Sequence, residues 1–589
     1  MIRPPFLRPL RWQIMGPSGA GKTTLCGALA AQLPVSPGAT LEGVVTVNGR
    51  PWDETVHCAF VKQDDEFFSQ MTVRETIDLA ARLRLHRSVP EATKAALVQQ
   101  LIGKLGLAKC AETAVGSSSS RGISGGERKR LSIALELLTA PGLLILDEPT
   151  SGLDAFAAES VVASLKRLAV TDGTTIVLTI HQPRASIYNM IDDLVLLADG
   201  RVVYAGPASQ AAAYFGRLGF PSPPGCSVAE FVVDLVSVDH SSPEAEAGSH
   251  ARLAQLAGAW AAAVRGTSSS GPGSKAVLSQ YLEASSSPGS SKAGSRPRAG
   301  PLDQFRLLFG RAWRQVTRDK ATTLVRATTA LSSALIFGSL FNRLGLSQPA
   351  IQSRLGLLQV AVINTAMSSL IKTLQAFPRE RAIVESERGK KAYAVFPYLT
   401  AKLLAELPTG ASFPLLFCSL LYPTAGLNGA PKRFARFLGI TTLTSLVAGS
   451  MGLTIGAAAP NAEAAVAIGP SLMVVFIILG GFYSSASTVP KALRWLAHGS
   501  LIKQGFEGLC VNDLQGLRFE TTGRPGEAAT GEQVLARLGY AETQLGAPVA
   551  ALSKLLLLNY VLTFAILKLK KPTFMQMTVP PSRAAAAGV

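Results

Sequence analysis

The chain has 589 residues and a formal net charge of +18, and 48% of its residues are hydrophobic while only 16% are charged. This composition is unusual for a soluble protein of that length, so part of the chain is expected to lie in lipid. The positive charge could indicate nucleic-acid binding, but no basic run is interleaved with aromatic residues and much of the excess flanks apolar segments. We therefore expect no nucleic-acid partner.

The first half has the pattern of an α/β domain. Residues 1–235 alternate short β-rich apolar runs with amphipathic stretches, which is typical of a mostly parallel sheet. Residues 236–300 are rich in Ser, Gly, Pro and Ala and are predicted to form a flexible linker. Over 301–322, apolar residues recur at helical spacing opposite arginines, which predicts an amphipathic connecting helix on the inner membrane face.

The second half, 323–571, has the pattern of an all-α membrane domain. Lys and Arg gather before its first apolar segment, between the second and third, and after the last, so the positive-inside rule puts both termini in the cytosol. Lys432, Arg433 and Arg436 disagree, because this topology places their loop outside. Segment 489–546 is predicted to be an external loop, and 572–589 a C-terminal tail. The six predicted spans are about 325–345, 355–373, 403–425, 437–459, 465–487 and 547–567.

The six cysteines lie far apart without a CxxC pair, which indicates neither a zinc site nor a disulfide framework. We expect single packed thiols. Cys510 is the only cysteine of the predicted external loop, so a disulfide within that loop is excluded.

The first motif that carries chemistry is Gly16-Pro-Ser-Gly-Ala-Gly-Lys22-Thr23, which fits the P-loop pattern and precedes a helical stretch. In such a loop backbone N–H groups converge on phosphate oxygens, the lysine pairs with the β- and γ-phosphates and the hydroxyl after it holds Mg²⁺. The alternative is a chance glycine-rich turn before a helix. The predicted nucleotide-binding residues are Gly16, Ser18, Gly19, Gly21, Lys22, Thr23 and Thr24.

A second motif supplies carboxylates. The apolar run Leu143–Leu146 leads into Asp147 and Glu148. Asp147 suits the Mg²⁺ shell, and Glu148 suits a base that orients the attacking water. Alone, a strand that ends in acids is usually a solvated edge, but beside a P-loop it indicates a nucleotide site.

The run Ile123-Ser124-Gly125-Gly126-Glu127-Arg128 resembles the signature motif of ATP-binding cassette proteins. Gln63 resembles the Q-loop glutamine of that family, the run 151–154 its D-loop, and His181 its switch histidine. A lone histidine is more often a satisfied core residue, but its place after the run TIVLTI favours the functional interpretation. The order of these motifs along the chain is that of the family.

The resemblance implies a site shared between two subunits. Ser124, Gly125 and Gly126 would act on the γ-phosphate bound to the opposing P-loop, so a chain with one nucleotide domain must dimerise. His181 and Gln63 would contact the γ-phosphate and the Mg²⁺ or water. The implied cofactors are ATP and Mg²⁺. The implied catalytic residues are Glu148, His181 and Gln63, and the implied metal-binding residues are Thr23, Gln63 and Asp147.

Longer runs, among them GPSGAGKTTL, SGGERKRLSIALELL, LDEPTSGLD and ERAIVESERGKKAYAVFPY, are similar to the G subfamily, the White-type half transporters. This implies a multi-pass membrane protein in which two half transporters, identical or different, export a small amphipathic or lipid-like substrate across a lipid bilayer. By resemblance, segment 377–391 is an inner coupling elbow, whereas its composition fits a solvated charged loop equally well.

One departure from the family motivates an alternative. Only 15 residues precede Gly16, so we expect the first strands of the nucleotide domain and its adenine-stacking aromatic to be missing, with Phe6 and Trp12 the sole aromatics there. A partner-dependent regulatory or degenerate subunit with weak ATPase of its own is therefore the alternative to an active exporter.

Overall fold

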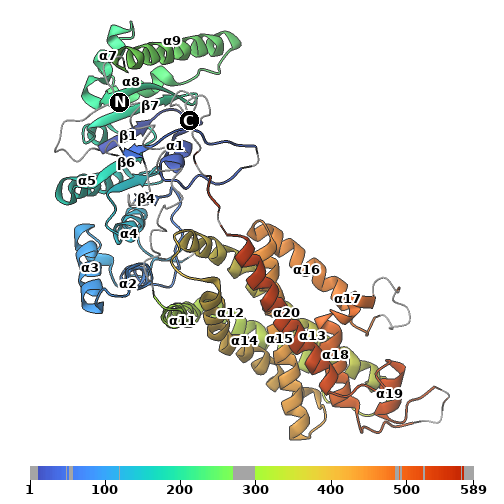
Figure 1. Ribbon diagram of the computed structural model, residues 1–589. Helices are drawn as coiled ribbons and strands as arrows, with labels where there is room; N and C mark the ends of the chain where they lie inside the picture. The colour runs from blue at the N-terminus through green and yellow to red at the C-terminus, as the bar shows by residue number, and fades with distance from the viewer. Residues whose placement is uncertain are drawn as a thin grey trace, which may run out of the picture. The chain divides into compact units, whose positions relative to one another are not determined.

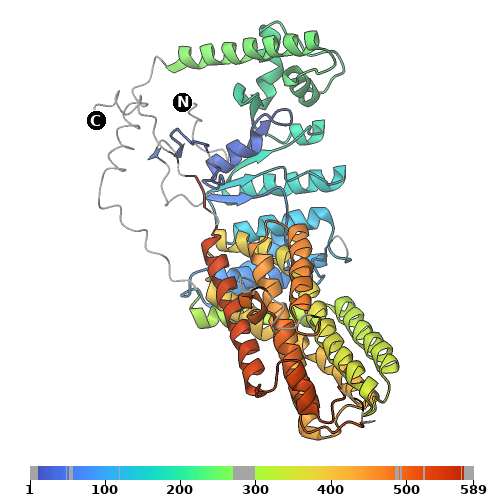
Figure 2. The ribbon, with the colours of Figure 1, turned by 90° about the vertical axis from the view of Figure 1, so that its right-hand side faces the viewer.

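The structure is a computed structural model that describes residues 11–36, 38–47, 50–51, 58–117, 120–268, 299–483, 490, 494–521, 524, 526–571, 573–575 and 577. The chain divides into two compact units, one of residues 1–300 with 572–589 and one of residues 301–571. The predicted fold class, an α/β P-loop domain followed by a helical membrane domain, is confirmed, as Figures 1 and 2 show.

A six-stranded sheet organises the first unit, in the order β4-β5-β6-β1-β7-β8. All neighbouring strands are parallel except the last pair, in which β8 runs antiparallel to β7. A separate two-stranded hairpin pairs β2 (Thr46–Val47) with β3 (Arg50–Pro51). The strands of the large sheet are β1 (Arg11–Met15), β4 (Cys58–Val61), β5 (Leu143–Leu146), β6 (Thr175–Thr179), β7 (Asp193–Ala198) and β8 (Arg201–Pro207).

Helices cover both faces of this sheet, as expected when parallel strands are buried on both sides. Helix α1 (Lys22–Leu29) buries Cys26 against Ile14, Phe60 and Ile145 on one face. The other face is covered by α5 (Ala155–Asp172), α7 (Ala211–Arg217) and α8 (Val228–Val236). A helical part between β4 and β5 contains α2 (Val73–Arg84), α3 (Glu91–Lys104) and α4 (Gly125–Leu137), and α6 (Ala185–Tyr188) follows β6.

The prediction of a flexible linker over 236–300 is wrong for its first half. Helix α9 (Pro243–Ser268) lies beside α7 and α8 (Figure 1). Its Trp260 ring packs 5.8 Å from Tyr204 and 5.9 Å from Tyr214, and Leu256 is buried. Alanine supports a helix more strongly than any other residue, so a small-residue composition does not by itself exclude one. Residues 269–298 lie outside the described residues.

The end of the chain pairs with the first unit. The Met575 N–H donates to the Leu33 carbonyl (2.9 Å), and the Val35 N–H donates to the Thr573 carbonyl (3.4 Å). The part of the tail that the structure describes is therefore attached to the nucleotide unit through backbone hydrogen bonds.

The second unit is helical. It begins with α11 (Pro301–Arg318), whose arginines and apolar residues lie on opposite faces. Its long helices run alongside one another in Figure 2. Among the described residues, five helices are long and apolar enough to cross a membrane, and α16 (Ala462–Ile478) is a shorter apolar helix of 17 residues. The five are α12 (Lys320–Leu340), α13 (Gln348–Gly389), α14 (Val395–Ala425), α15 (Pro431–Ala458) and α20 (Gly546–Leu569).

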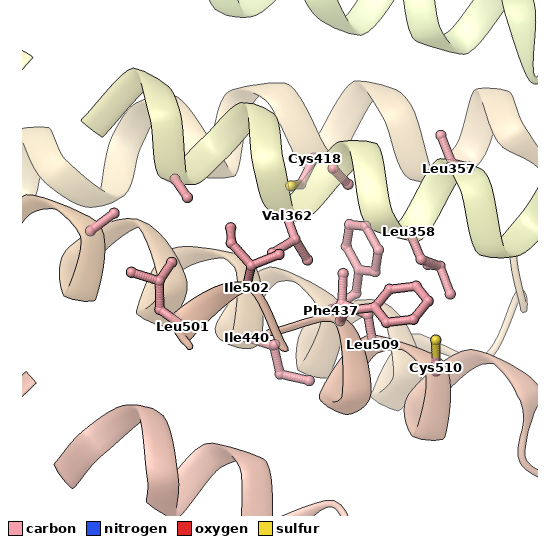
Figure 3. Packing of buried hydrophobic residues seen from close by; sticks show 14 of the residues in the cluster. Leu357, Leu358, Val362, Cys418, Phe437, Ile440, Leu501, Ile502, Leu509 and Cys510 are labelled. Carbon is pink, nitrogen blue, oxygen red and sulfur yellow. The ribbon is translucent and has the colours of Figure 1, made fainter. Parts of the chain in front are cut away.

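The core of this unit forms around α13 and α15, which are its most buried long helices. Glycines of α15 allow close approach: a Cβ added at Gly452 would lie 2.9 Å from the Thr373 Cβ, and one at Gly456 would lie 3.0 Å from the Phe377 ring. Small residues at helix interfaces permit this packing in membranes. Figure 3 shows part of the same core, where Phe437 meets Leu358 and Leu509.

Segment 377–391 is not a loop, because α13 continues through it to Gly389. Two of its arginines bind the carboxyl ends of other helices. Arg381 donates to the Gly456, Ala457 and Ala459 carbonyls at the end of α15 (2.9, 3.1 and 2.6 Å). Arg388 donates to the Leu567 carbonyl of α20 (2.7 Å). The interpretation as a freely solvated charged loop is therefore wrong.

Segment 489–546 also differs from a simple loop. It contains α17 (Arg494–His498), α18 (Leu501–Leu514) and α19 (Gly531–Arg537), and α18 is buried among the apolar helices. Cys510 of α18 is one of six free, separate cysteines. Arg433 donates to the Asn512, Asp513 and Gln515 carbonyls, so the charge that disagreed with the positive-inside pattern neutralises a helix C-terminus.

Substituting Gly452 by Val tests the packing of α13 on α15. The added side chain meets Thr373 and the Leu370 carbonyl, so we expect destabilisation of about 2 kcal/mol, seen as a lower unfolding midpoint of the purified protein in detergent. Gly439→Val, on the same helix with no atom within 4 Å of an added Cβ, is the matched control and should leave the midpoint unchanged. Equal midpoints for the two variants would contradict the close approach.

Candidate functional site

The predicted site residues gather where the parallel strands end. Parallel strands have their carboxyl ends at one edge of a sheet, where ligands of α/β folds bind. The P-loop follows β1, Gln63 follows β4, Asp147 and Glu148 follow β5, and His181 follows β6. Four loops far apart in sequence thus supply one surface.

The P-loop bends sharply between β1 and α1. Gly16 has φ +152°, and a Cβ there would lie 2.2 Å from the Leu197 carbonyl oxygen, so no side chain fits. The Lys22 ammonium crosses the loop and donates to the Gly16 and Pro17 carbonyls, each at 3.0 Å. Burial lowers the pKa of Lys22, and the carboxylates of Glu148 and Asp147 oppose this shift.

The register of the sheet brings the polar groups together in pairs. Val61 of β4 is level with Leu146 of β5, so the residues two places beyond each, Gln63 and Glu148, also meet. The Gln63 amide donates to a Glu148 carboxylate oxygen at 3.0 Å. This pair is exposed at the edge, which suits groups that contact a ligand and water.

Asp147 is held from the neighbouring strand. Leu146 is level with Leu178 of β6, so Asp147 faces Thr179, whose hydroxyl donates to the Asp147 carboxylate at 2.8 Å and accepts from the Glu148 N–H at 2.7 Å. Thr179 is fully buried. The Thr179 hydroxyl therefore orients both acids from the buried side. Glu148 itself has a left-handed backbone (φ +43°), a conformation that is concentrated at functional sites.

His181 reaches the P-loop from β6. Its Nε2 lies 3.2 Å from the Ser18 hydroxyl, and the next residue, Gln182, also has a positive φ of +46°. The histidine is exposed rather than part of the core, against the alternative of a satisfied core residue. It thus lies beside the loop that the phosphate prediction requires.

The residues at this edge fit a magnesium nucleotide. Mg²⁺ prefers oxygen ligands, and the Asp147 carboxylate, the Gln63 amide and the Thr23 hydroxyl at the first turn of α1 supply them. Thr23 and Thr24 are exposed at the helix N-terminus, where N–H groups and the helix dipole favour phosphate. The metal and nucleotide roles of all these residues stay predictions.

The signature turn is built separately. Ser124 caps α4: its hydroxyl accepts from the Glu127 N–H (3.3 Å), and the Glu127 carboxylate accepts from the Ser124 N–H (2.8 Å). Gly125 and Gly126 pack against Leu153 and Ala157, beside the D-loop. Within the described part of the chain, no hydrogen bond joins this turn to the P-loop, and Ser124 and Gly125 are exposed.

Sequence reasoning missed Thr179 and Glu127. The signal for Thr179 was its place two residues before His181 at the end of an apolar strand, and the signal for Glu127 was its spacing of three from Ser124, a capping box. Trp12 is a half-buried residue of β1. Phe6 lies outside the described residues.

Comparison with known proteins agrees with this geometry. Residues 9–151 match the ABC transporter family, and residues 303–514 match the ABC-2 type transporter family, with a second ABC-2 type match at 181–260. ABC transporter G family member 7 of Arabidopsis thaliana is 47% identical over 96% of this chain and 77% of its own length.

More distant relatives agree. Protein white of Drosophila melanogaster is 32% identical over 95% of this chain and 81% of its own. ABC transporter G family member 1 of Dictyostelium discoideum is 29% identical over 95% and 80%. The chain is therefore a half transporter of the ABC transporter G family, an ATPase coupled to transmembrane transport whose nucleotide-binding domain precedes its membrane domain.

Proposed function

We propose that two half transporters, either two copies of this chain or this chain and a relative, bind two ATP molecules between them and export a small amphipathic or lipid-like substrate. The observation that carries this is the division of the site. The P-loop, Gln63, Glu148 and His181 meet at one edge, while Ser124 is exposed elsewhere on the same domain. A second domain that faces the first supplies the missing half of each site.

Exposed apolar surface beside the D-loop supports this pairing. Phe156, two residues after Asp154, is 84% exposed, and the Asp154 carboxylate caps α5 by accepting from the Phe156 and Ala157 N–H groups. An exposed aromatic in the first turn of a capped helix suits a protein contact, because aromatic residues are enriched at interface cores.

The described geometry supports the following roles for this chain's own residues. Lys22 and the P-loop N–H groups would bind phosphate, and Glu148 would orient a water for in-line attack while Gln63 holds its carboxylate. His181, beside Ser18, would contact the γ-phosphate. When bound, Mg²⁺ would neutralise the phosphate charge.

In the membrane unit, a helical segment would transmit the movement of the nucleotide domains to the spans. Segment 377–389 is a continuous helix whose Arg381 and Arg388 bind the ends of α15 and α20. The connecting helix α11 joins it through an ion pair between the buried Arg311 and the half-buried Glu387 (2.8 Å). A displacement of segment 377–389 would move several spans together. Closure of the nucleotide domains would thereby open an outward path, and hydrolysis would reset it.

The substrate class and direction follow from the resemblance to White-type half transporters. Both termini would be cytosolic, by the charge distribution around the spans. Whether the dimer contains one or two kinds of chain decides between an autonomous exporter and a partner-dependent subunit, and ATPase measurements on the purified chain distinguish these.

Glu148→Gln tests the hydrolytic role. The purified chain in lipid vesicles should show vanadate-sensitive ATPase, and this variant should lose about 100-fold or more of it because a general base is removed while the fold is kept. Glu91→Gln, which neutralises an exposed carboxylate away from the nucleotide site, is the control and should retain activity. A folded wild-type chain without ATPase indicates the partner-dependent subunit instead.

Thr179→Val tests how the acids are held. The isosteric change leaves the Asp147 oxygen and the Glu148 N–H without their partner, so the apparent Mg²⁺ affinity in ATPase assays should fall about 10-fold. Thr179→Ser keeps the hydroxyl and should stay near wild type. If both variants have the same Mg²⁺ dependence as the wild type, the hydroxyl does not orient the acids.

A further inference from the structure

Helix α4 carries a buried lysine that binds the segment after β4. The Lys129 ammonium donates to the Gln63 carbonyl (2.9 Å) and the Lys62 carbonyl (3.3 Å). It also forms an ion pair with Asp65 at 2.8 Å, and the exposed fractions of the two side chains are 4% and 7%. Lys129 is therefore attached to three positions at the Q-loop glutamine, 62, 63 and 65.

The burial of this pair needs a reason. Removing two charges from water is costly, and a buried ion pair adds little to stability over an apolar pair of similar volume. Burial raises the pKa of Asp65, and the charge of Lys129 opposes that shift. Such pairs are better explained by the arrangement that they specify than by stability.

Neighbouring cations of α4 bind other parts of the domain. Arg128 donates to the Val115 and Gly116 carbonyls, at 3.1 and 3.2 Å, and Arg130 donates to the Ser160 hydroxyl at 3.4 Å. Lys129 differs from both because its contacts are at the segment that enters the nucleotide site.

The positions on either side of Lys129 belong to two different ATP sites in the proposed dimer. Ser124, five residues earlier, caps the same helix and would contact the nucleotide of the opposite P-loop. Gln63, whose carbonyl Lys129 binds, donates from its side chain to Glu148 of its own site at 3.0 Å. The first turn of α4 and the Lys129 side chain thus connect Ser124, which would serve one site, with Gln63, which would serve the other.

We propose that Lys129 is a positioning residue that ties the Q-loop to the signature helix, so that the alignment of Gln63 with Glu148 in one ATP site depends on engagement of Ser124 at the other. This inference rests on the proposed function, because it requires two composite sites. A movement of α4 on nucleotide binding would be passed to the Q-loop backbone through the Lys129 contacts. The consequence is positive cooperativity between the two sites.

The experiment uses the full chain in lipid vesicles. Lys129→Met alone would leave Asp65 buried without its partner, so the informative variant is Lys129→Met combined with Asp65→Leu, which replaces the pair by apolar side chains. Lys129→Arg keeps the charge and can donate to the same carbonyls. The control is Lys94→Met, which removes another buried lysine, on α3.

The readout is vanadate-sensitive ATPase as a function of ATP concentration. We expect a sigmoidal wild-type curve with a Hill coefficient that approaches ~2, the number of sites, and a coefficient of ~1 in the double variant. Its kcat should fall ~10-fold, because Gln63 is no longer aligned, while the half-saturating ATP concentration changes less than ~3-fold since the P-loop is intact. Lys129→Arg and Lys94→Met should keep the sigmoidal curve.

The outcomes separate this inference from the proposed function. If the wild-type chain has no vanadate-sensitive ATPase and traps no nucleotide with vanadate, the proposal of an autonomous dimer fails, and the inference with it. If the wild type hydrolyses and traps ATP but its curve is hyperbolic, only the inference is wrong. It is equally wrong if the folded double variant keeps the sigmoidal curve, whether or not kcat falls.

Discussion

The register of three parallel strands, β4, β5 and β6, determines how the acids of the nucleotide site meet the groups that orient them. Because Val61 is level with Leu146, and Leu146 with Leu178, residues at equal offsets beyond the strands meet side by side. The Asp147 N–H donates to the Val61 carbonyl at 2.9 Å, which continues the ladder past the ends of the strands. A shift of one residue in either pairing would turn these side chains to opposite faces and separate the acids from the groups that orient them.

In the membrane unit, arginine side chains bind the carbonyls that have no partner within their own helix. The last carbonyls of a helix have no partner within it, and in an apolar surrounding an unsatisfied group is costly. Arg381, Arg388 and Arg433 each donate to such carbonyls, on α15, α20 and α18. A basic residue near a span can thus serve a helix end, and this explains why Arg433 disagrees with a topology inferred from charge alone.

The sequence predicted the order of the motifs and their common edge, because each motif follows a short apolar run and parallel strands share one edge. It did not predict Thr179, since a threonine at the end of a strand is also an ordinary β-former, and its role appears only when β5 and β6 are in register. It misjudged α9 because composition does not show where Leu256 and Trp260 lie relative to Tyr204. It left two interpretations of segment 377–391 open, because composition does not show that Arg381 and Arg388 bind the ends of α15 and α20.

Two kinds of contact between the helices of this chain respond differently when the helices are displaced. Where Gly452 packs on Thr373, an approach of a few tenths of an ångström is resisted by van der Waals repulsion, so α13 and α15 should move as one body. Where Arg433 of α15 meets the end of α18, a cation faces several carbonyl oxygens, each with two lone pairs. Such a contact survives small displacements by exchanging one oxygen for the next. Motion driven by nucleotide is therefore expected at the contact between α15 and α18 and not within the glycine-packed pair of α13 and α15.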